Sequence, residues 1–166
     1  DSYDFLFIND HRYVLHPCGP RSGLLIYIFW FSMTKAIALF SGGLDSMLAA
    51  ELVRKQKIEI LGLTFTTPFF GSRKATSAAK EINLPLAVED ITTEHLKMLK
   101  SPRYGYGKNM NPCIDCHTLM LQTAGRKMED SGSDFIITGE VLGQRPMSQN
   151  KQSLYIVAKN SGYIDY

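Results

Sequence analysis

One segment has the residue types and spacing of an anion-binding loop: Ser41, Gly42, Gly43, Leu44, Asp45 and Ser46. Glycines let the backbone turn sharply and aim several N–H groups at one anion at the start of a helix, and the serines add hydroxyl donors. The segment lacks the Gly-Lys-Ser/Thr of a Walker A loop and the Gly-x-Gly-x-x-Gly of a dinucleotide-binding turn. The alternative is an ordinary strand-to-helix turn in which Asp45 or Ser46 caps the helix, but a cap needs only one polar residue.

A second segment carries two thiols three residues apart, Cys113 and Cys116, just before an expected helix. At a helix N-terminus the dipole lowers the pKa of a thiol, so we expect a thiolate suited to sulfur chemistry. A tetrahedral zinc site needs two more ligands, and we expect His117 to point elsewhere on the helix. Half of a zinc site and a pair of structural thiols remain as alternatives.

A basic and aromatic stretch precedes the cysteines. Between Glu94 and Asp115 the chain has no acidic residue, and it carries Lys97, Lys100, Arg103, Tyr104, Tyr106 and Lys108. Cations interleaved with aromatic rings suit an RNA backbone and its unstacked bases. A solvated surface loop is the alternative interpretation.

The hydrophobic pattern predicts the elements that position these segments. Short apolar runs predict strands, and helical spacing predicts helices. The expected strands are residues 35–40, 58–65, 86–91, 135–138 and 154–158, and the expected helices are residues 44–57, 75–82 and 117–131. This alternation predicts an α/β fold with a doubly wound, mostly parallel sheet that binds ligands at the carboxyl ends of its strands.

Two charged residues, Glu140 and Arg145, follow the strand expected at residues 135–138. The topology places them at the same sheet edge as the glycine-rich segment. There Arg145 would bind a phosphate, and Glu140 would position a metal or a ribose. A structural ion pair between the two is the alternative.

Residues 41–46 resemble the pyrophosphate loop of the PP-loop ATP-pyrophosphatase superfamily, which has an adenine nucleotide alpha hydrolase-like fold. Residues 111–113 (Asn-Pro-Cys), followed by Cys116, resemble a segment of the tRNA 2-thiouridylases. The pattern Cys113-x-x-Cys116-x-x-x-Met120, followed by residues 138–144 (Thr-Gly-Glu-Val-Leu-Gly-Gln) and 148–149 (Ser-Gln), looks like the catalytic domain of tRNA 4-thiouridine synthetases, the thiamine-biosynthesis-type sulfurtransferases.

This resemblance implies an ATP-dependent tRNA sulfurtransferase that adenylates a uridine carbonyl oxygen, releases pyrophosphate and then replaces the oxygen with sulfur. The implied catalytic residues are Asp45, Cys113 and Cys116. The implied nucleotide contacts are Ser41, Gly42, Gly43, Leu44, Ser46, Leu63, Thr64, Gly139, Glu140 and Arg145. Mg²⁺ is implied near Asp45, and an iron–sulfur cluster or a zinc ion is a candidate ligand of the two cysteines.

The implied partners are tRNA and a sulfur donor such as a cysteine desulfurase, and a homodimer is a further candidate. Two other classes of function stay open. One is a PP-loop ligase or amidating enzyme that uses ATP and ammonia, which needs the same loop but no thiols. The other is a truncated, non-catalytic domain that binds a nucleotide or RNA.

The composition is that of a globular protein, with 45% hydrophobic and 20% charged residues and a net charge of +2 over 166 residues. No apolar run reaches the length of about 18 to 20 residues that spans a bilayer, so we expect no membrane partner. Three cysteines, two of them close together, favour the cytoplasm over a secreted disulfide framework. We expect a leader of doubtful origin at residues 1–32, with an extra strand as the alternative, and a PP-loop ATP-pyrophosphatase domain at residues 33–166 that is truncated at its C-terminus.

Overall fold

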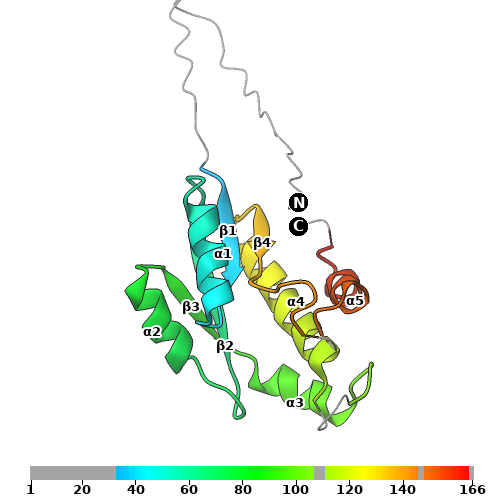
Figure 1. Cartoon of the computed structure of the whole chain (residues 1–166). Coiled ribbons are helices and arrows are strands. Elements are labelled where there is room, and N and C mark those ends of the chain that lie inside the picture. Colours follow the sequence, from blue (N-terminus) through cyan, green and yellow to red (C-terminus); the bar gives the residue numbers. More distant parts are fainter. Residues whose placement is uncertain (1–32, 107–110, 146–147, 165–166) are drawn as a thin grey trace, which may run out of the picture. The chain divides into compact units, whose positions relative to one another are not determined.

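The computed structural model describes residues 33–106, 111–145 and 148–164. Helices and strands alternate along this part of the chain (Figure 1). They are β1 (Lys35–Leu39), α1 (Leu44–Arg54), β2 (Glu59–Thr66), α2 (Arg73–Glu81), β3 (Leu86–Asp90), α3 (Thr92–Lys100), α4 (Cys113–Ser131), β4 (Phe135–Ile137) and α5 (Lys151–Ser161). The first four predicted strands and the first two predicted helices are present, with small differences at their ends.

The four strands form one sheet in the order β3-β2-β1-β4, and every neighbouring pair is parallel. The chain moves outward from β1 through β2 to β3 and then returns to the other side of β1 with β4. Ligands typically bind at such a switch point, outside the carboxyl ends of the two strands. Residues 41–46 follow β1 and residues 138–145 follow β4, so the topology places both candidate segments at this edge.

Helices cover both faces of the sheet. Successive strand residues point to opposite faces, and each set packs in its own apolar core against helices. On one face, Ala38, Phe40 and Ile60 pack with α1 and α2. On the other face, Ile37 and Leu63 pack with α4. Burial on both faces explains why the strands appear in the sequence as continuous apolar runs. The doubly wound, parallel α/β fold predicted from the sequence is confirmed.

Residues 154–158, predicted as a strand, lie inside helix α5, so this prediction was wrong. Five consecutive apolar residues have no period that separates a strand from a turn of partly buried helix. The side chain of Asn150 caps the start of α5 by accepting a hydrogen bond from the Ser153 N–H at 2.8 Å. Gly162 ends the helix with a φ of 84°. A helix therefore follows β4, where the sequence pattern predicts a fifth strand.

Two further differences concern the helices around the cysteines. The sequence pattern does not predict α3, whose first turn is stabilised by Asp90: its Oδ1 accepts a hydrogen bond from the Thr92 N–H at 2.8 Å. A hydrogen bond from the Thr92 side chain and, to a smaller extent, this backbone hydrogen bond lower the pKa of the Asp90 carboxyl. Helix α4 begins at Cys113, although residue 117 is its predicted start. Both cysteines therefore lie within the first turn of a helix.

Two predictions fall outside the described residues. They are the leader at residues 1–32 and the contribution of Lys108 to the basic stretch. Among the residues that the structure does describe, we find no helix with the length and apolar character needed to cross a membrane.

Candidate active site

The phosphate loop, residues 41–46, folds back on itself between β1 and α1. The Ser41 Oγ accepts a hydrogen bond from the Gly43 N–H at 3.2 Å. The Ser46 hydroxyl donates to the Gly43 carbonyl at 2.8 Å and lies 3.3 Å from the Ser41 hydroxyl. The N-cap residue of α1 is Gly43, which has no side chain to cap the helix. The alternative of a turn capped by Asp45 or Ser46 is therefore wrong, and the first N–H groups of α1 are left for another acceptor.

Two glycines bring distant backbone segments into contact with this loop. A Cβ at Gly42, whose φ is +72°, would lie 2.7 Å from the Lys74 carbonyl oxygen at the start of α2. A Cβ at Gly139 would lie 2.6 Å from both the N and the Cα of Ser46. Real Cβ atoms do not approach other atoms so closely, so only glycine fits at either position. The segment after β4 therefore packs directly on the first turn of α1, as the topology predicts.

A side chain from the same segment contacts the candidate catalytic acid. The Gln144 amide donates a hydrogen bond to the Asp45 carboxylate, with an Nε2–Oδ2 distance of 3.3 Å. Arg145, the next residue, is exposed, and its backbone carbonyl accepts a hydrogen bond from the Gln149 N–H at 2.9 Å. Gln144 is absent from the predicted site residues, although it is part of the motif at residues 138–144.

Two of the implied nucleotide contacts, Leu63 and Thr64, lie within strand β2, which continues to Thr66. Leu63 is completely buried in the core facing α4, which removes its side chain from a nucleotide site. Thr64 is also buried.

The cysteine turn is the first turn of α4. Cys113 and Cys116 are free and partly buried. Positions i, i+3 and i+4 are neighbours on a helix, so both thiols share one helical face with His117. Burial, together with the neighbouring Cys113, raises the pKa of the Cys116 thiol to about 11. The expected thiolate is therefore wrong for Cys116, because desolvation outweighs the favourable helix dipole.

His117 makes a close contact with Glu140 that the sequence does not reveal. Its Nδ1 lies 2.7 Å from the Glu140 Oε1, and both side chains are mostly buried. The alternative Glu140–Arg145 pair is therefore wrong, because the Glu140 carboxylate is engaged by the imidazole. Glu140 directly follows Gly139, which packs on the phosphate loop. Residues 138–145 thus touch the phosphate loop on one side and the cysteine turn on the other.

The basic and aromatic stretch lies beside the cysteine turn. Lys97 and Lys100 are exposed on α3, and Arg103, Tyr104 and Tyr106 are exposed in the loop that follows α3. In Figure 1, α3 and this loop lie close to the start of α4. The Arg103 and Tyr104 N–H groups bond to Asp115, which lies between the two cysteines, so this part of the stretch adjoins the cysteine turn.

The buried side chain of His95 packs against the segment that follows β2. The ring of His95, on α3, lies 5.7 Å from the Phe69 ring and 5.5 Å from the Phe70 ring, measured between centroids. Burial lowers the pKa of His95, so the imidazole is held in its neutral form. We therefore assign His95 to packing at this edge of the sheet.

The donor set for a resident metal is incomplete in the described residues. Among them, no three His, Cys, Asp or Glu side chains are placed to hold a metal ion together. Cys113 and Cys116 supply two thiols, whereas zinc sites and iron–sulfur clusters generally use four protein ligands. Asp45 supplies the carboxylate predicted for Mg²⁺, and its Oδ2 accepts from Gln144. These residues do not fit an iron–sulfur cluster or a zinc ion without further ligands.

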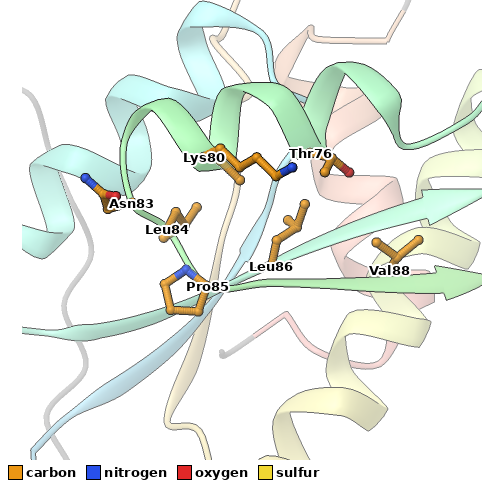
Figure 2. A pocket seen from close by; sticks show the side chains of 8 residues that line it. Thr76, Lys80, Asn83, Leu84, Pro85, Leu86 and Val88 are labelled. Carbon is orange, nitrogen blue, oxygen red and sulfur yellow. The ribbon is translucent and has the colours of Figure 1, made fainter.

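An open groove runs between α2 and the edge strand β3 (Figure 2). Its lining comprises Thr76, Ala79, Lys80, Asn83, Leu84, Pro85, Leu86 and Val88. Lys80 is the only charged side chain in this lining, and none of the predicted site residues belongs to it. The candidate active site therefore lies at the carboxyl ends of β1 and β4, and this groove is separate from it.

Comparisons with known proteins agree with this site. Residues 31–164 match the family described as "Thiamine biosynthesis protein (ThiI)". A "Probable tRNA sulfurtransferase" from Thermococcus kodakarensis is 30% identical, and the aligned part covers 76% of this chain and 34% of the relative. A "tRNA-specific 2-thiouridylase MnmA" from Clostridium acetobutylicum is 31% identical, over 76% of this chain and 40% of the relative. The chain thus spans about a third of the length of the Thermococcus relative.

A solved structure shows the same relationship. The crystal structure of a 4-thiouridine synthetase–RNA complex with bound ATP superposes with a TM-score of 0.60 at 26% identity, and the match covers 76% of this chain and 34% of that protein. These matches confirm the resemblance to PP-loop enzymes that thiolate tRNA. Because the family match extends over most of its residues, the chain belongs to the thiamine biosynthesis protein (ThiI) family.

Proposed function

We propose that this chain forms the part of a tRNA sulfurtransferase that activates a uridine with ATP and delivers sulfur to it. The observation that carries the proposal is the position of residues 138–145 between the phosphate loop and the cysteine turn, which we call the two half-sites. Gly139 abuts Ser46 of the phosphate loop, and Glu140 pairs with His117 on the cysteine turn. A nucleotide on the loop and a thiol on α4 would therefore serve one reaction. The names of the relatives support the same activity.

The phosphate loop would carry out the first half-reaction. The uridine carbonyl oxygen attacks the α-phosphorus of ATP, the bond to the β-phosphate breaks, and pyrophosphate leaves. Backbone N–H groups at the start of α1 would hold the phosphates. Hydrogen bonds within the loop already fix the loop's backbone, so little reorganisation is needed during the reaction. Mg²⁺ would supply charge neutralisation when bound, with Asp45 as its proposed ligand. Gly139, Glu140 and Arg145 remain proposed nucleotide contacts.

The cysteine turn would carry out the second half-reaction. A donor such as a cysteine desulfurase first loads one thiol with a sulfur atom, giving a persulfide. The terminal sulfur attacks the adenylated carbon, and AMP leaves with the electrons of the broken C–O bond. The second thiol then attacks the inner sulfur, which releases the thiocarbonyl on the RNA and joins Cys113 to Cys116. A cellular thiol reductant restores the two thiols.

The surroundings of the two cysteines support this assignment. Both are free thiols on one face of a helix turn, at the spacing that lets one attack a group carried by the other. Two thiols that must cycle between reduced and oxidised forms fit a reducing compartment, so we propose the cytoplasm. The sulfur donor and a homodimer remain predictions.

Exchange of radiolabelled pyrophosphate into ATP, in the presence of unmodified tRNA, tests the first half-reaction. Ser46→Ala removes the hydroxyl that bonds to the Gly43 carbonyl, and Asp45→Ala removes the carboxylate contacted by Gln144. We expect either substitution to slow exchange by about 10² to 10³, as does loss of a preorganised polar group in other active sites. Ser77→Ala, at an exposed serine on α2, is the control and should leave the rate unchanged. Full exchange by both loop variants would contradict the proposal.

A further inference from the structure

One acidic side chain ties the basic and aromatic loop to the cysteine turn. Asp115 lies between the two cysteines on the first turn of α4. Its Oδ1 accepts a hydrogen bond from the Arg103 N–H, and its Oδ2 accepts one from the Tyr104 N–H, both at 3.0 Å. Both carboxylate oxygens therefore hold the main chain of a loop that lies earlier in the sequence. Asp115 and the two thiols share one helical turn, which rises only about 5.4 Å.

Helix α5 holds the same two loop residues from another side. The Asn160 Oδ1 accepts a hydrogen bond from the Arg103 Nη1 at 3.1 Å, and the Asn160 amide donates to the Tyr104 hydroxyl at 2.9 Å. The Asn160 carbonyl accepts from the Gln122 amide on α4 at 3.1 Å. The side chains of Arg103 and Tyr104 are thus fixed by a residue that is itself tied to α4.

These contacts build a platform of one cation and one aromatic ring. The Arg103 Cζ lies over the Tyr104 ring, 5.7 Å from its centroid. Tyr104 is 41% exposed, and Arg103 is also exposed. Within the described part of the chain, the Arg103 guanidinium has no carboxylate partner, so its charge is available to an anion. A fixed ring beside a guanidinium suits an unstacked nucleotide, because the base stacks and the phosphate pairs with the cation.

We infer that Asp115 is a positioning residue: it keeps the Arg103–Tyr104 platform beside the thiols so that an RNA nucleotide bound there is presented to Cys113 and Cys116. This inference rests on the proposed function, because RNA is the substrate there. Fixing the loop in advance removes the entropy cost of ordering it when RNA binds. Exposed Lys97 and Lys100 on α3 add positive charge along the approach.

Binding of a fluorescent, unmodified tRNA transcript to the 166-residue chain tests the inference. Asp115→Asn replaces one acceptor oxygen by an NH₂ group that faces a backbone N–H. We expect tRNA affinity to fall about tenfold, as for the loss of a charged hydrogen bond, while ATP affinity stays the same. Hydrogen exchange of the Arg103 and Tyr104 amides should become faster. The matched control is Asp130→Asn, an equal charge change at an exposed position of the same helix, which should alter none of these quantities.

A double-mutant cycle separates positioning from simple loss of charge. A variant with both Arg103→Ala and Tyr104→Ala removes the platform and should also weaken tRNA binding. If Asp115 acts through the platform, adding Asp115→Asn to this variant weakens tRNA binding no further. Additive losses would show that Asp115 acts on tRNA independently of the platform, and this would overturn the inference.

The remaining outcomes distinguish the two proposals. Equal tRNA affinity for wild type and Asp115→Asn would overturn the positioning role and leave the proposed function intact. A loss of ATP affinity in Asp115→Asn would show a general structural role and would also overturn the inference. A wild-type chain that binds ATP but no tRNA would overturn the inference, whereas the proposed function is tested separately by pyrophosphate exchange and by thiolation.

Discussion

The phosphate loop and the cysteine turn lie at the same sheet edge but are built in different ways. The loop is made of backbone: Gly43 begins α1, and serine hydroxyls bond to the loop's own main chain. The turn is made of side chains, and two side chains beside the thiols contact other segments. His117 pairs with Glu140, and Asp115 holds the loop after α3.

This difference shows which kind of site a short motif can encode. A backbone cradle needs particular residues in consecutive positions, so its requirements are local. A side-chain site needs groups that the fold brings together, so its properties depend on burial and on neighbours distant in sequence. The two half-sites should therefore respond differently to substitution, and the following four tests use that contrast.

The largest effect should come from the thiols. Cys113→Ser and Cys116→Ser should each nearly abolish thiolation of tRNA, because a serine oxygen cannot form a persulfide. ATP–pyrophosphate exchange should persist, since the loop is untouched. Mass spectrometry of the tRNA nucleosides, with a cysteine desulfurase, free cysteine and a thiol reductant present, measures the first activity. Equal thiolation by wild type and both variants would make the cysteines structural and favour an ATP-using ligase that needs no thiols.

Adding one carbon at Gly139 should damage the phosphate loop. Gly139→Ala places a Cβ 2.6 Å from the backbone of Ser46, and the first turn of α1 has to move away. We expect a loss of about 1 to 3 kcal/mol of folding free energy, as for other overpacked sites, and weaker ATP binding. Gly71→Ala is the control, because a Cβ there meets no atom within 4 Å. Urea unfolding and ATP titration measure both effects, and wild-type values for Gly139→Ala would contradict the close packing.

Breaking the link between the two half-sites should have an intermediate effect. Glu140→Gln removes the carboxylate that lies 2.7 Å from the His117 Nδ1, and we expect thiolation to slow about tenfold, which corresponds to about 1.4 kcal/mol of activation free energy. Pyrophosphate exchange should change much less if Glu140 acts mainly through the cysteine turn. Glu81→Gln, at an exposed position of α2, is the matched control. A larger effect on exchange than on thiolation would assign Glu140 to the nucleotide instead.

The smallest effect should be a change in the pKa of Cys116. Because the pKa is raised to about 11, the thiol stays protonated at neutral pH, and thiolate forms only as the pH approaches that value. Cys113→Ser removes the smaller of the two causes, so the pKa should fall only part of the way to its ordinary value. The pH dependence of iodoacetamide alkylation at the peptide that contains Cys116 measures this shift. An unchanged profile would leave burial as the sole cause.

Much of the fold is predictable from the chain's hydrophobic pattern, because strands buried on both faces and amphipathic helices leave distinct local signals. The phosphate loop is predictable for the same reason: its conformation depends on glycines and serines that are consecutive in the chain. The topology also predicts that the segment after β4 lies beside the phosphate loop, which the contact of Gly139 with Ser46 confirms, although the motif at residues 138–144 does not single out Gln144.

Other features exist only in the folded protein. The helical state of residues 154–158 depends on a cap at Asn150 and a left-handed Gly162, because the apolar run itself is ambiguous. The partner of Glu140 is an imidazole on α4, which no spacing in the sequence indicates. Burial reverses the pKa shift expected for Cys116, because the free energy of a charge depends on all the groups and solvent around it, including those contributed by distant segments.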